Sequence, residues 1–414
     1  MALIVQKFGG TSVANIERIR NVATKVKKEL DLGNHVAVVV SAMSGVTNQL
    51  VGYVQELSKL TSDIAWEEYD QIVSSGEQVT SGLLSLCLNE MGIPAQSFTG
   101  WQMPLKTDKA HGKARIESID PTLMLAALKA GKVVVVAGFQ GVDKDGRIAT
   151  LGRGGSDTSA VALTAALKAD RCDIYTDVDG VYTTDPRLVP DARKLDKISY
   201  EEMLELASLG AKVLQTRSVE MAMNHGVTVQ VLTSFDENVI GSNWPGTLLV
   251  SEEELVEKRN VTGIAYSRDD ARILITGIAN VPGMVAALFG PLADAGINVD
   301  MIVQNITEDG KATDITFTVP KTELERALAV VDGLKPVLKY RSVMDDKNVA
   351  KVSIVGVGMK SHAGVAQTMF KALAEKNINI LVISTSEIKV SVIISSDYTE
   401  LAVRALHAAF EMEK

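Results

Sequence analysis

A lysine and two glycines stand near the start of the 414-residue chain, in residues 7–13 (KFGGTSV), directly after the apolar run at residues 2–5. Glycines let the main chain turn tightly and aim free N–H groups at an anion, and the lysine adds a full positive charge beside them. In the P-loop of nucleotide triphosphatases the lysine follows the glycines, whereas here it precedes them. The segment therefore indicates a phosphate site of another kind, although a strand-turn-helix corner that needs glycine would contain the same residues.

A second glycine-rich segment, residues 151–160 (LGRGGSDTSA), opens into an apolar periodic stretch that predicts a helix over 157–169. The free N–H groups of a helix N-terminus attract anions, and glycines allow a phosphate to come close. Arg153 adds a planar fork that suits a carboxylate or a phosphate. An N-cap at Ser156 or Asp157 would explain the start of the helix, but it would explain neither the arginine nor the third glycine.

Three further polar positions are ambiguous when each is taken alone. Residues 175–187 (YTDVDGVYTTDPR) carry hydroxyls, acids and an arginine that could hold a nucleotide, yet two consecutive turns would give the same spacing. Glu77 lies in a tight turn before a predicted helix, where an acid is commonly just a helix-start charge. Lys212, in residues 209–214 (LGAKVL), would by default be a surface lysine.

The composition restricts the class of partner and the compartment. A net charge of −9 and a pI near 5.3 argue against nucleic acid and anionic membrane, and favour a small metabolite. Cys87 and Cys172 both have apolar neighbours, so we expect two buried free thiols in a reducing compartment. The five histidines lack metal-ligand spacing, which disfavours a protein-held zinc site. No charged leader or long apolar run is present, and we expect a cytoplasmic protein.

The first part of the chain alternates short apolar runs with helical periodicity. Strands are predicted at 36–40, 132–137, 173–175 and 227–232, with helices at 16–30 and 157–169 among them. This alternation is typical of an α/β fold with a mostly parallel sheet between helices. Such sheets bind ligands at the carboxyl ends of their strands, where the polar segments 41–47 and 138–141 would lie.

The pattern changes after the turn-rich residues 241–247, which a charged run at 251–259 follows. We therefore predict one domain over 1–245 and a linker over 246–260. Beyond it, residues 273–298 are echoed by residues 352–379, and from Gly283 onward the offset is constant at 364 − 283 = 81. Each copy reads as strand, helix, strand, strand, helix, which predicts two ferredoxin-like βαββαβ domains. The first would span 268–345. The second, 346–414, lacks a last strand, which we expect residues 261–267 to supply.

Taken in this order, the segments 7–12, 41–44, 152–157 and 183–187 and the duplicated C-terminal units resemble the aspartokinases of the amino-acid kinase family. The resemblance covers essentially the whole chain. It implies an amino-acid kinase fold, two ACT regulatory domains, and ATP-dependent phosphorylation of the L-aspartate β-carboxylate to 4-phospho-L-aspartate, which opens the synthesis of lysine, threonine and methionine. Mg²⁺ would be carried by ATP rather than held by the protein.

The resemblance also assigns roles to individual residues. The catalytic residues would be Lys7 and Asp157. The ATP site would comprise Lys7, Phe8, Gly9, Gly10, Ser41, Thr176, Asp177, Tyr182, Asp185, Arg187 and Lys212. The aspartate site would comprise Thr47, Glu77, Arg153, Gly154 and Ser156, with Ser41 beside them.

These roles make chemical sense. A carboxylate is already ionised at pH 7, so the nucleophile needs no general base, and the difficulty is the repulsion between two anions. Lys7, Mg²⁺ and the loop amides would neutralise that charge. Arg153 would hold the α-carboxylate of aspartate and Glu77 its ammonium, while Asp157 would orient Lys7 or a metal-bound water.

The two C-terminal units contain no obvious catalytic group, so we expect them to bind ligands. The resemblance implies feedback inhibition by lysine and threonine, bound between chains of a homo-oligomer or of a mixed assembly with a short regulatory-only subunit. Units that only dimerise are the alternative. The effector site would comprise Asn280, Val281, Pro282, Gly283, Met284, Val285, Gln304, Asn379, Ile380, Ser386 and Glu387.

Two other functions stay open at this stage. A sister kinase acting on glutamate or N-acetylglutamate would share the phosphate site, but the doubled regulatory units and residues 183–187 favour aspartate. A non-catalytic amino-acid sensor would have no reason to keep Lys7, Arg153 and Asp157.

Overall fold

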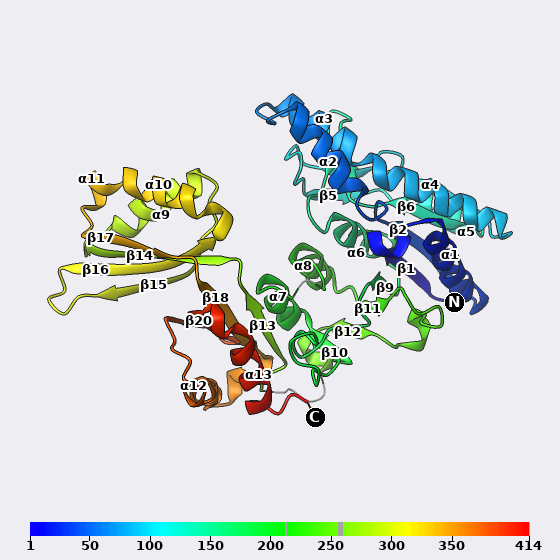
Figure 1. The fold of residues 1–414 in the computed structure, drawn as a ribbon. Coiled ribbons are helices and arrows are strands. Elements are labelled where there is room, and N and C mark those ends of the chain that lie inside the picture. The colour runs from blue at the N-terminus through cyan, green and yellow to red at the C-terminus, as the bar shows by residue number, and fades with distance from the viewer. Residues whose placement is uncertain (212, 256–259, 414) are drawn as a thin grey trace. The chain divides into compact units, whose positions relative to one another are not determined.

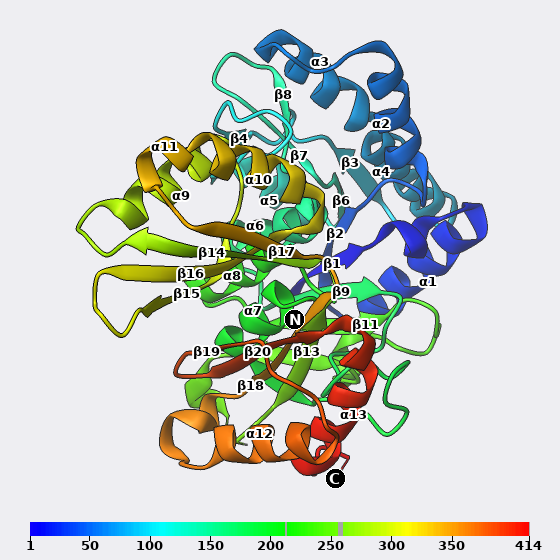
Figure 2. The same cartoon turned by 60° about the vertical axis from the view of Figure 1, so that its left-hand side comes forward.

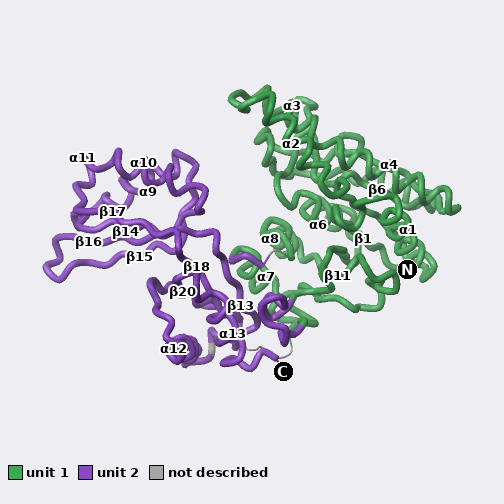
Figure 3. The backbone as a smooth tube through the Cα atoms, in the orientation of Figure 1, with its two compact units in different colours: residues 1–181, 194–208, 212–257 green, residues 182–193, 209–211, 258–414 purple. Residues whose placement is uncertain are grey.

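The computed structural model describes residues 1–211, 213–255 and 260–413. The chain forms two compact units, which Figure 3 distinguishes by colour. The first contains residues 1–181, 194–208 and 212–257, and the second contains 182–193, 209–211 and 258–414, as far as they are described. Each unit is described separately below.

The first unit is built on an eight-stranded sheet with the order β10-β12-β11-β9-β1-β2-β6-β3 (Figure 1). Six neighbouring strands, from β11 to β3, run parallel, and β12 is antiparallel to β11. This arrangement confirms the predicted α/β fold with a mostly parallel sheet. The strands are β1 (Leu3–Phe8), β2 (His35–Val40), β3 (Ala95–Phe98), β6 (Val133–Ala137), β9 (Arg171–Thr176), β10 (Lys197–Ser199), β11 (Val229–Thr233) and β12 (Thr247–Val250).

Helices surround this sheet, and a smaller sheet with the order β5-β4-β7-β8 belongs to the same unit. Asn15 caps α1 by accepting a hydrogen bond from the Arg18 N–H, and the apolar face of α1 packs into the same core cluster as β1 and β2. The helices are α1 (Ile16–Asp31), α2 (Val46–Leu57), α3 (Asp63–Val73), α4 (Ser75–Glu90), α5 (Thr122–Lys129), α6 (Gly155–Leu167), α7 (Tyr200–Ser208) and α8 (Thr216–His225), with short 3-10 helices η1 (Gly10–Val13), η2 (Gly241–Asn243) and η3 (Glu252–Glu254). The small strands are β4 (Leu105–Thr107), β5 (Ile116–Ile119), β7 (Gln140–Val142) and β8 (Ile148–Thr150).

A buried ionic group fastens the segment after β11 to the sheet. Arg171 donates from Nε to Asp173 Oδ1 at 2.8 Å and from Nη2 to Glu29 Oε1 at 3.3 Å. Glu29 also accepts the N–H and hydroxyl of Ser242. Gly241 has no room for a side chain, since a Cβ there would lie 1.9 Å from Asp173 Oδ2. The group holds this long connection in one conformation.

Three details of the first unit differ from the sequence expectations. Residues 247–250 form β12 within the large sheet, so the predicted linker over 246–260 is wrong there. Helix α6 begins at Gly155 rather than at 157, because the glycines themselves enter its first turn. Cys87 and Cys172 are both free thiols, but Cys87 is only partly buried. The last four residues of the charged run, 256–259, lie outside the described residues.

The second unit contains two four-stranded antiparallel sheets, which Figure 2 shows from another side. The first sheet has the order β15-β16-β14-β17, and the second has the order β13-β18-β20-β19. The strands are β13 (Gly263–Ser267), β14 (Asp270–Ala279), β15 (Asp300–Ile306), β16 (Ala312–Pro320), β17 (Ser342–Asp346), β18 (Val349–Val355), β19 (Val382–Thr385) and β20 (Lys389–Ser395). The helices are α9 (Met284–Asp294), α10 (Leu324–Gly333), α11 (Lys335–Leu338), α12 (Val365–Glu375) and α13 (Thr399–Ala409), with 3-10 helices η4 (Lys321–Glu323), η5 (Val357–Ser361) and η6 (Ser396–Tyr398).

The two sheets complete their edges differently. In the first repeat β17 follows β16 along the chain and pairs with β14. In the second repeat the equivalent place beside β18 is taken by β13, which pairs in register from Gly263 opposite Val355 to Ser267 opposite Lys351. The upstream strand that we expected from the sequence therefore pairs with the second repeat, and the repeats are interlocked through the chain.

Residues 182–193 pack against the second repeat. Val189 and Ala192 belong to its buried apolar cluster, and the Ile264 N–H donates to Thr183 O at 2.7 Å. Thr183 Oγ1 lies 3.0 Å from His407 Nε2 on α13, and both side chains are buried. The compact units therefore differ here from the predicted domain of residues 1–245. None of the helices in the described parts of the chain is long and apolar enough to cross a membrane.

Candidate active site

Four neighbouring strands of the large sheet end at the same edge. The pairing of β1 with β2 and β9 puts Lys7 between Val39 and Ile174. Beyond the strand ends, the N–H of Gly9 donates to Tyr175 O at 3.2 Å, and the N–H of Ser41 donates to Phe8 O at 3.1 Å. Because these strands run parallel, the loops that follow them gather at one place.

Lys7 forms a buried ion pair at this edge. Its Nζ lies 2.5 Å from Asp157 Oδ1 in the first turn of α6, and the two side chains are 10% and 11% exposed. Gly9 lies directly beside the ammonium, since a Cβ at this position would be 3.5 Å from Lys7 Nζ. The structure thus brings together the lysine of the first motif and the acid of the second, next to a glycine that adds no side chain there.

The glycines of residues 151–155 are required by the backbone conformation and by close packing. Gly152 and Gly154 adopt φ of +77° and +68°, which L-residues with side chains rarely do. A Cβ at Gly154 would also lie 1.9 Å from the Gln215 side chain, and one at Gly155 would lie 2.8 Å from the Phe139 ring. Arg153, between them, is exposed, whereas Ser156 is buried beside Gly138. The main chain is closely packed here, and only the arginine side chain extends into solvent.

Glu77 lies in the first turn of α4 and is 3% exposed. Its Oε2 has no hydrogen-bond partner among the described residues. Burial raises the pKa of Glu77 to about 7, opposed by hydrogen bonds from the backbone of Ala42 and of Glu77 itself. A buried carboxylate oxygen without a partner is well suited to a ligand that brings a cation, such as an ammonium group.

The remaining predicted site residues of the first unit differ in how far their side chains are exposed to solvent. The Phe8 side chain is buried and stacks on Tyr175 with ring centroids 4.6 Å apart, so only its main chain can face a ligand. Thr47 lies in the first turn of α2 and is partly buried. Thr176 ends β9, and Asp177 beside it is exposed. Gly10 is held close to Ala42, whose carbonyl oxygen would lie 3.0 Å from a Cβ at that glycine.

Three of the residues predicted for the ATP site belong to the second unit, namely Tyr182, Asp185 and Arg187. Arg187 donates to Asp185 from Nε and from Nη2, at 3.0 and 2.8 Å, and Tyr266 donates its hydroxyl to Asp185 at 3.3 Å. The pKa of Asp185 is held below its usual value, chiefly by the hydrogen bond from Arg187. Lys212 lies outside the described residues.

The predicted effector residues lie on both repeats of the second unit. Residues 280–283 connect β14 to α9, and Gly283 has φ of +93°, as Gly364 has +97° before α12. Gln304 is exposed on β15. Asn379 and Ile380 precede β19, and Ser386 and Glu387 lie in the turn between β19 and β20. The repeat found in the sequence is thus also a repeat of loop geometry.

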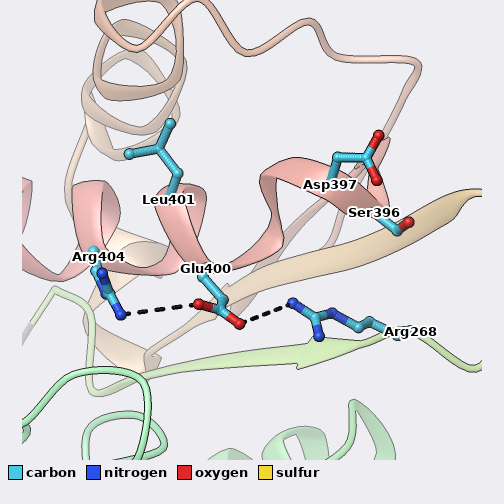
Figure 4. Close-up of a pocket in the computed structure, with 6 residues that line it drawn as sticks. All are labelled: Arg268, Ser396, Asp397, Glu400, Leu401 and Arg404. Carbon is cyan, nitrogen blue, oxygen red and sulfur yellow. Dashed lines mark hydrogen bonds and ion pairs between the residues drawn. The ribbon is translucent and has the colours of Figure 1, made fainter.

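The second unit has a hollow elsewhere, lined by Arg268, Ser396, Asp397, Glu400, Leu401 and Arg404 (Figure 4). Glu400 lies between the two arginines, with nitrogen-oxygen distances of 3.4 Å to Arg268 and 3.9 Å to Arg404. About half of each charged side chain is exposed, and none of the predicted site residues lines the hollow. Such exposed pairs contribute little stability, and we assign this hollow no part in the site.

Sequence reasoning missed two buried groups near these motifs. The hydroxyl of Ser12, two residues after the glycine pair, is buried and has no partner among the described residues. Asp70 on α3 is fully buried and accepts several hydrogen bonds from distant segments. The motif signal contains Ser12, but no local pattern marks Asp70, since its partners are about 40 to 80 positions away.

Comparison with known proteins defines the class. The model of the amino acid kinase family matches residues 2–233, which puts the first unit in that class, and two ACT domain models match residues 272–335 and 352–410. The aspartokinase of Pseudomonas aeruginosa is 57% identical over all of this chain and 98% of its own length, and the aspartate kinase of Pseudomonas putida is 56% identical with the same coverage. The chain therefore belongs to the aspartokinases, the allosteric enzymes of amino-acid biosynthesis that phosphorylate aspartate.

A solved structure supports the same conclusion. E. coli aspartokinase III in complex with aspartate and ADP, in its R-state, has a TM-score of 0.80 and 27% identity, and the match covers 98% of this chain and 99% of that one. The same protein in complex with lysine and aspartate, in its T-state, has a TM-score of 0.75 and 26% identity, covering 99% of each chain.

The raised pKa of Glu77 leads to a prediction about pH. If Glu77 binds the ammonium of aspartate, only the ionised carboxylate can do so, and a pKa of about 7 leaves it half protonated in the free enzyme at neutral pH. We expect kcat/KM for aspartate to fall about tenfold for each pH unit below 7. Initial rates between pH 5.5 and 8.5 at saturating ATP would measure this.

The variant Glu77→Gln provides the control. It should raise the KM for aspartate and lose the acidic limb of the profile. Because the pKa of Glu77 in the folded protein lies above its ordinary value of 4.5, ionisation costs stability, and this cost is absent at low pH and fully present above pH 7. The free energy of unfolding of Glu77→Gln relative to wild type should therefore rise by about 2–3 kcal/mol between pH 5 and 8. A pH-independent difference would contradict the buried carboxylate.

Proposed function

We propose that this chain transfers the γ-phosphoryl group of ATP to the β-carboxylate of L-aspartate, giving 4-phospho-L-aspartate and ADP. The buried ion pair of Lys7 with Asp157, directly beside the side-chain-free Gly9, is the observation that carries the proposal. The related E. coli enzyme, crystallised with aspartate and ADP, supports the choice of both substrates.

In this reaction a carboxylate oxygen attacks the γ-phosphorus and the bond to the β-γ bridging oxygen breaks. The nucleophile is already ionised, so no residue needs to accept a proton from it. Lys7 stabilises the charge on the phosphoryl oxygens, and Asp157 keeps the lysine side chain oriented. The N–H groups at the start of α6 add fixed dipoles at the same place.

The substrate aspartate is bound through its α-carboxylate and its ammonium group, away from the reacting β-carboxylate. Arg153 binds its α-carboxylate and Glu77 its ammonium, so that the β-carboxylate is the one directed at ATP. Thr47, Ser41 and Ser156 supply hydroxyls beside them. Mg²⁺ bound to the ATP phosphates would supply further positive charge, and no group of three acidic, histidine or cysteine side chains suited to a metal occurs among the described residues.

We further propose that lysine or threonine inhibits the enzyme by binding to the ACT repeats at the residues named above. The E. coli enzyme crystallised with lysine in a T-state supports this. The packing of residues 182–193 against β13 and α13 supports a connection between the regulatory repeats and the segment expected at the nucleotide. An assembly through the ACT repeats and a cytoplasmic location are part of the same proposal.

A single assay tests the activity. The purified full-length protein would be given MgATP with aspartate, glutamate or N-acetylglutamate in turn, and ADP release would be measured through a coupled reaction. We expect turnover with aspartate alone, reduced by lysine and threonine tested singly and together. Turnover with glutamate instead would overturn the substrate, and no response to any amino acid would leave the ACT repeats without a regulatory role.

A further inference from the structure

We propose that Asp70 and His111 are positioning residues that set the place of Arg153 and thereby the affinity for aspartate. This inference rests on the proposed function, because it concerns the same substrate site. Asp70 lies on α3 and is fully buried, yet no arginine or lysine is among the partners recorded for its carboxylate.

The Asp70 carboxylate joins two segments that are distant from it in sequence. It accepts a hydrogen bond from His111 Nδ1 at 2.8 Å and from the N–H of Gly112 at 3.1 Å. It also accepts a short hydrogen bond from the hydroxyl of Thr150, the last residue of β8. Thr150 stands three residues before Arg153. One buried group therefore fixes both the 111–112 loop and the strand that leads into the arginine.

The same two segments are held together a second time. The N–H of Ala114 donates to Thr150 O at 2.9 Å. Arg217 on α8 donates from Nη2 to Ala114 O at 2.9 Å and from Nη1 to Leu151 O at 2.5 Å. At Gly152 a Cβ would lie only 3.2 Å from Gly112 O. The main chain directly before Arg153 thus rests on the loop that Asp70 holds.

His111 adds a second carboxylate to this group. Its Nε2 lies 3.6 Å from Asp143 Oδ2, and its side chain is almost fully buried. Asp143 in turn accepts the N–H groups of Asp145 and Arg147 in the turn between β7 and β8. The imidazole therefore lies between α3 and the hairpin whose second strand ends at Thr150.

Arg153 itself is exposed, so nothing in its own side-chain packing fixes it. Its charge is felt at Tyr69, the neighbour of Asp70: burial and then the Asp70 charge raise the pKa of the Tyr69 hydroxyl, and the Arg153 charge acts in the opposite direction. An exposed arginine must become ordered when it binds a ligand, and this ordering reduces the affinity. A rigid main chain at the arginine limits that cost and fixes the direction of the side chain. Asp70 supplies that main-chain support.

The test is kinetic and uses Asp70→Asn, which keeps the volume but turns one acceptor oxygen into a donor that faces other donors. We expect the KM for aspartate to rise about tenfold or more, by analogy with the effect of removing the residues that orient metal ligands. The KM for ATP should stay unchanged. A merely structural loss would reduce the fraction of active enzyme and hence the apparent kcat, but it would not change KM.

Three comparisons make the result specific. Asp120→Asn alters an exposed carboxylate that likewise accepts a backbone N–H, from Thr122, and should leave both KM values unchanged. His111→Asn keeps a donor near the Nδ1 position and should stay near wild type, whereas His111→Ala should raise the KM for aspartate. If Asp70→Asn does not fold, the comparison of His111→Asn with His111→Ala tests the inference instead.

The decisive measurement is the double variant Asp70→Asn/Arg153→Ala. Since Asp70 acts through Arg153, adding Asp70→Asn to Arg153→Ala should change the KM for aspartate no further. Multiplicative effects of the two substitutions on the KM for aspartate would overturn the inference, as would an unchanged KM in both Asp70→Asn and His111→Ala. In either case, turnover by the wild type would leave the proposed function intact. Absence of aspartate-dependent ADP release from wild type would overturn both.

Discussion

Lys7→Ala is expected to lower kcat for aspartate phosphorylation by about 10²-fold or more, the size of effect seen when one preorganised donor to a developing anion is removed. The lysine is the cationic side chain that the structure places in an ion pair at the end of β1, 2.5 Å from Asp157 and beside Gly9, which adds no side chain there. Its loss would leave the charge of the transferred phosphoryl group without its main protein partner. Steady-state kinetics at saturating MgATP and aspartate would measure the change.

The control for this variant must separate catalysis from folding. Removing Lys7 leaves Asp157 buried without its cation, and breaking a buried pair in this way typically costs about 3–5 kcal/mol of stability. The double variant Lys7→Ala/Asp157→Asn removes that charge as well. We expect it to regain much of the stability and none of the activity. Near-normal turnover in either variant would contradict the role of Lys7.

The mostly parallel sheet and the two glycine motifs could be predicted because their signals are local. The apolar run before Lys7, and the glycines that precede the apolar periodicity of α6, each specify a strand end or a helix start within about ten residues. Parallel pairing then brings these two ends together without further information. The Lys7–Asp157 ion pair joins residues 150 positions apart, yet it follows from that arrangement.

The buried polar groups could not be predicted in the same way. Glu29, Arg171 and Asp173 form one ionic group, but Glu29 is 142 positions from its arginine and looks like an ordinary charge of α1. Burial raises the pKa of Asp173 to about 6, opposed by the hydrogen bond from Arg171. Asp70 is a similar case, since its partners His111 and Thr150 come from other elements. Periodicity shows which face of a helix is apolar, but not which acid is buried with partners.

The boundary near residue 245 shows a second limit. Residues 247–250 were predicted as linker because a turn-rich stretch precedes them and a charged run follows, yet they form β12. A strand of four residues between such neighbours gives too short a pattern to recognise, although it pairs with both β10 and β11. Residues 182–193 likewise lie within the kinase sequence but pack with the second repeat, because Val189 and Ala192 complete its apolar cluster.

Arg153→Ala is expected to raise the KM for aspartate by about 10- to 100-fold, the equivalent of losing one charge-assisted hydrogen bond of about 1.5–3 kcal/mol. The arginine is exposed and its neighbours Gly152 and Gly154 are rigidly packed, so the variant should fold normally and lose only the guanidinium. The KM for ATP should change little, because in the proposed site Lys7 and the N–H groups at the start of α6 hold the phosphates. Measuring both KM values in the same preparation would separate the two substrates.

Arg153→Lys sharpens this result. Lysine keeps the positive charge but has no planar fork, so it should recover only part of the affinity if the arginine binds the α-carboxylate in a bidentate manner. Full recovery would mean that charge alone matters. If instead the affinity for ATP fell most in Arg153→Ala, the arginine would belong to the phosphate side of the site, and Glu77 would remain as the main determinant of which carboxylate of aspartate is presented to the nucleotide.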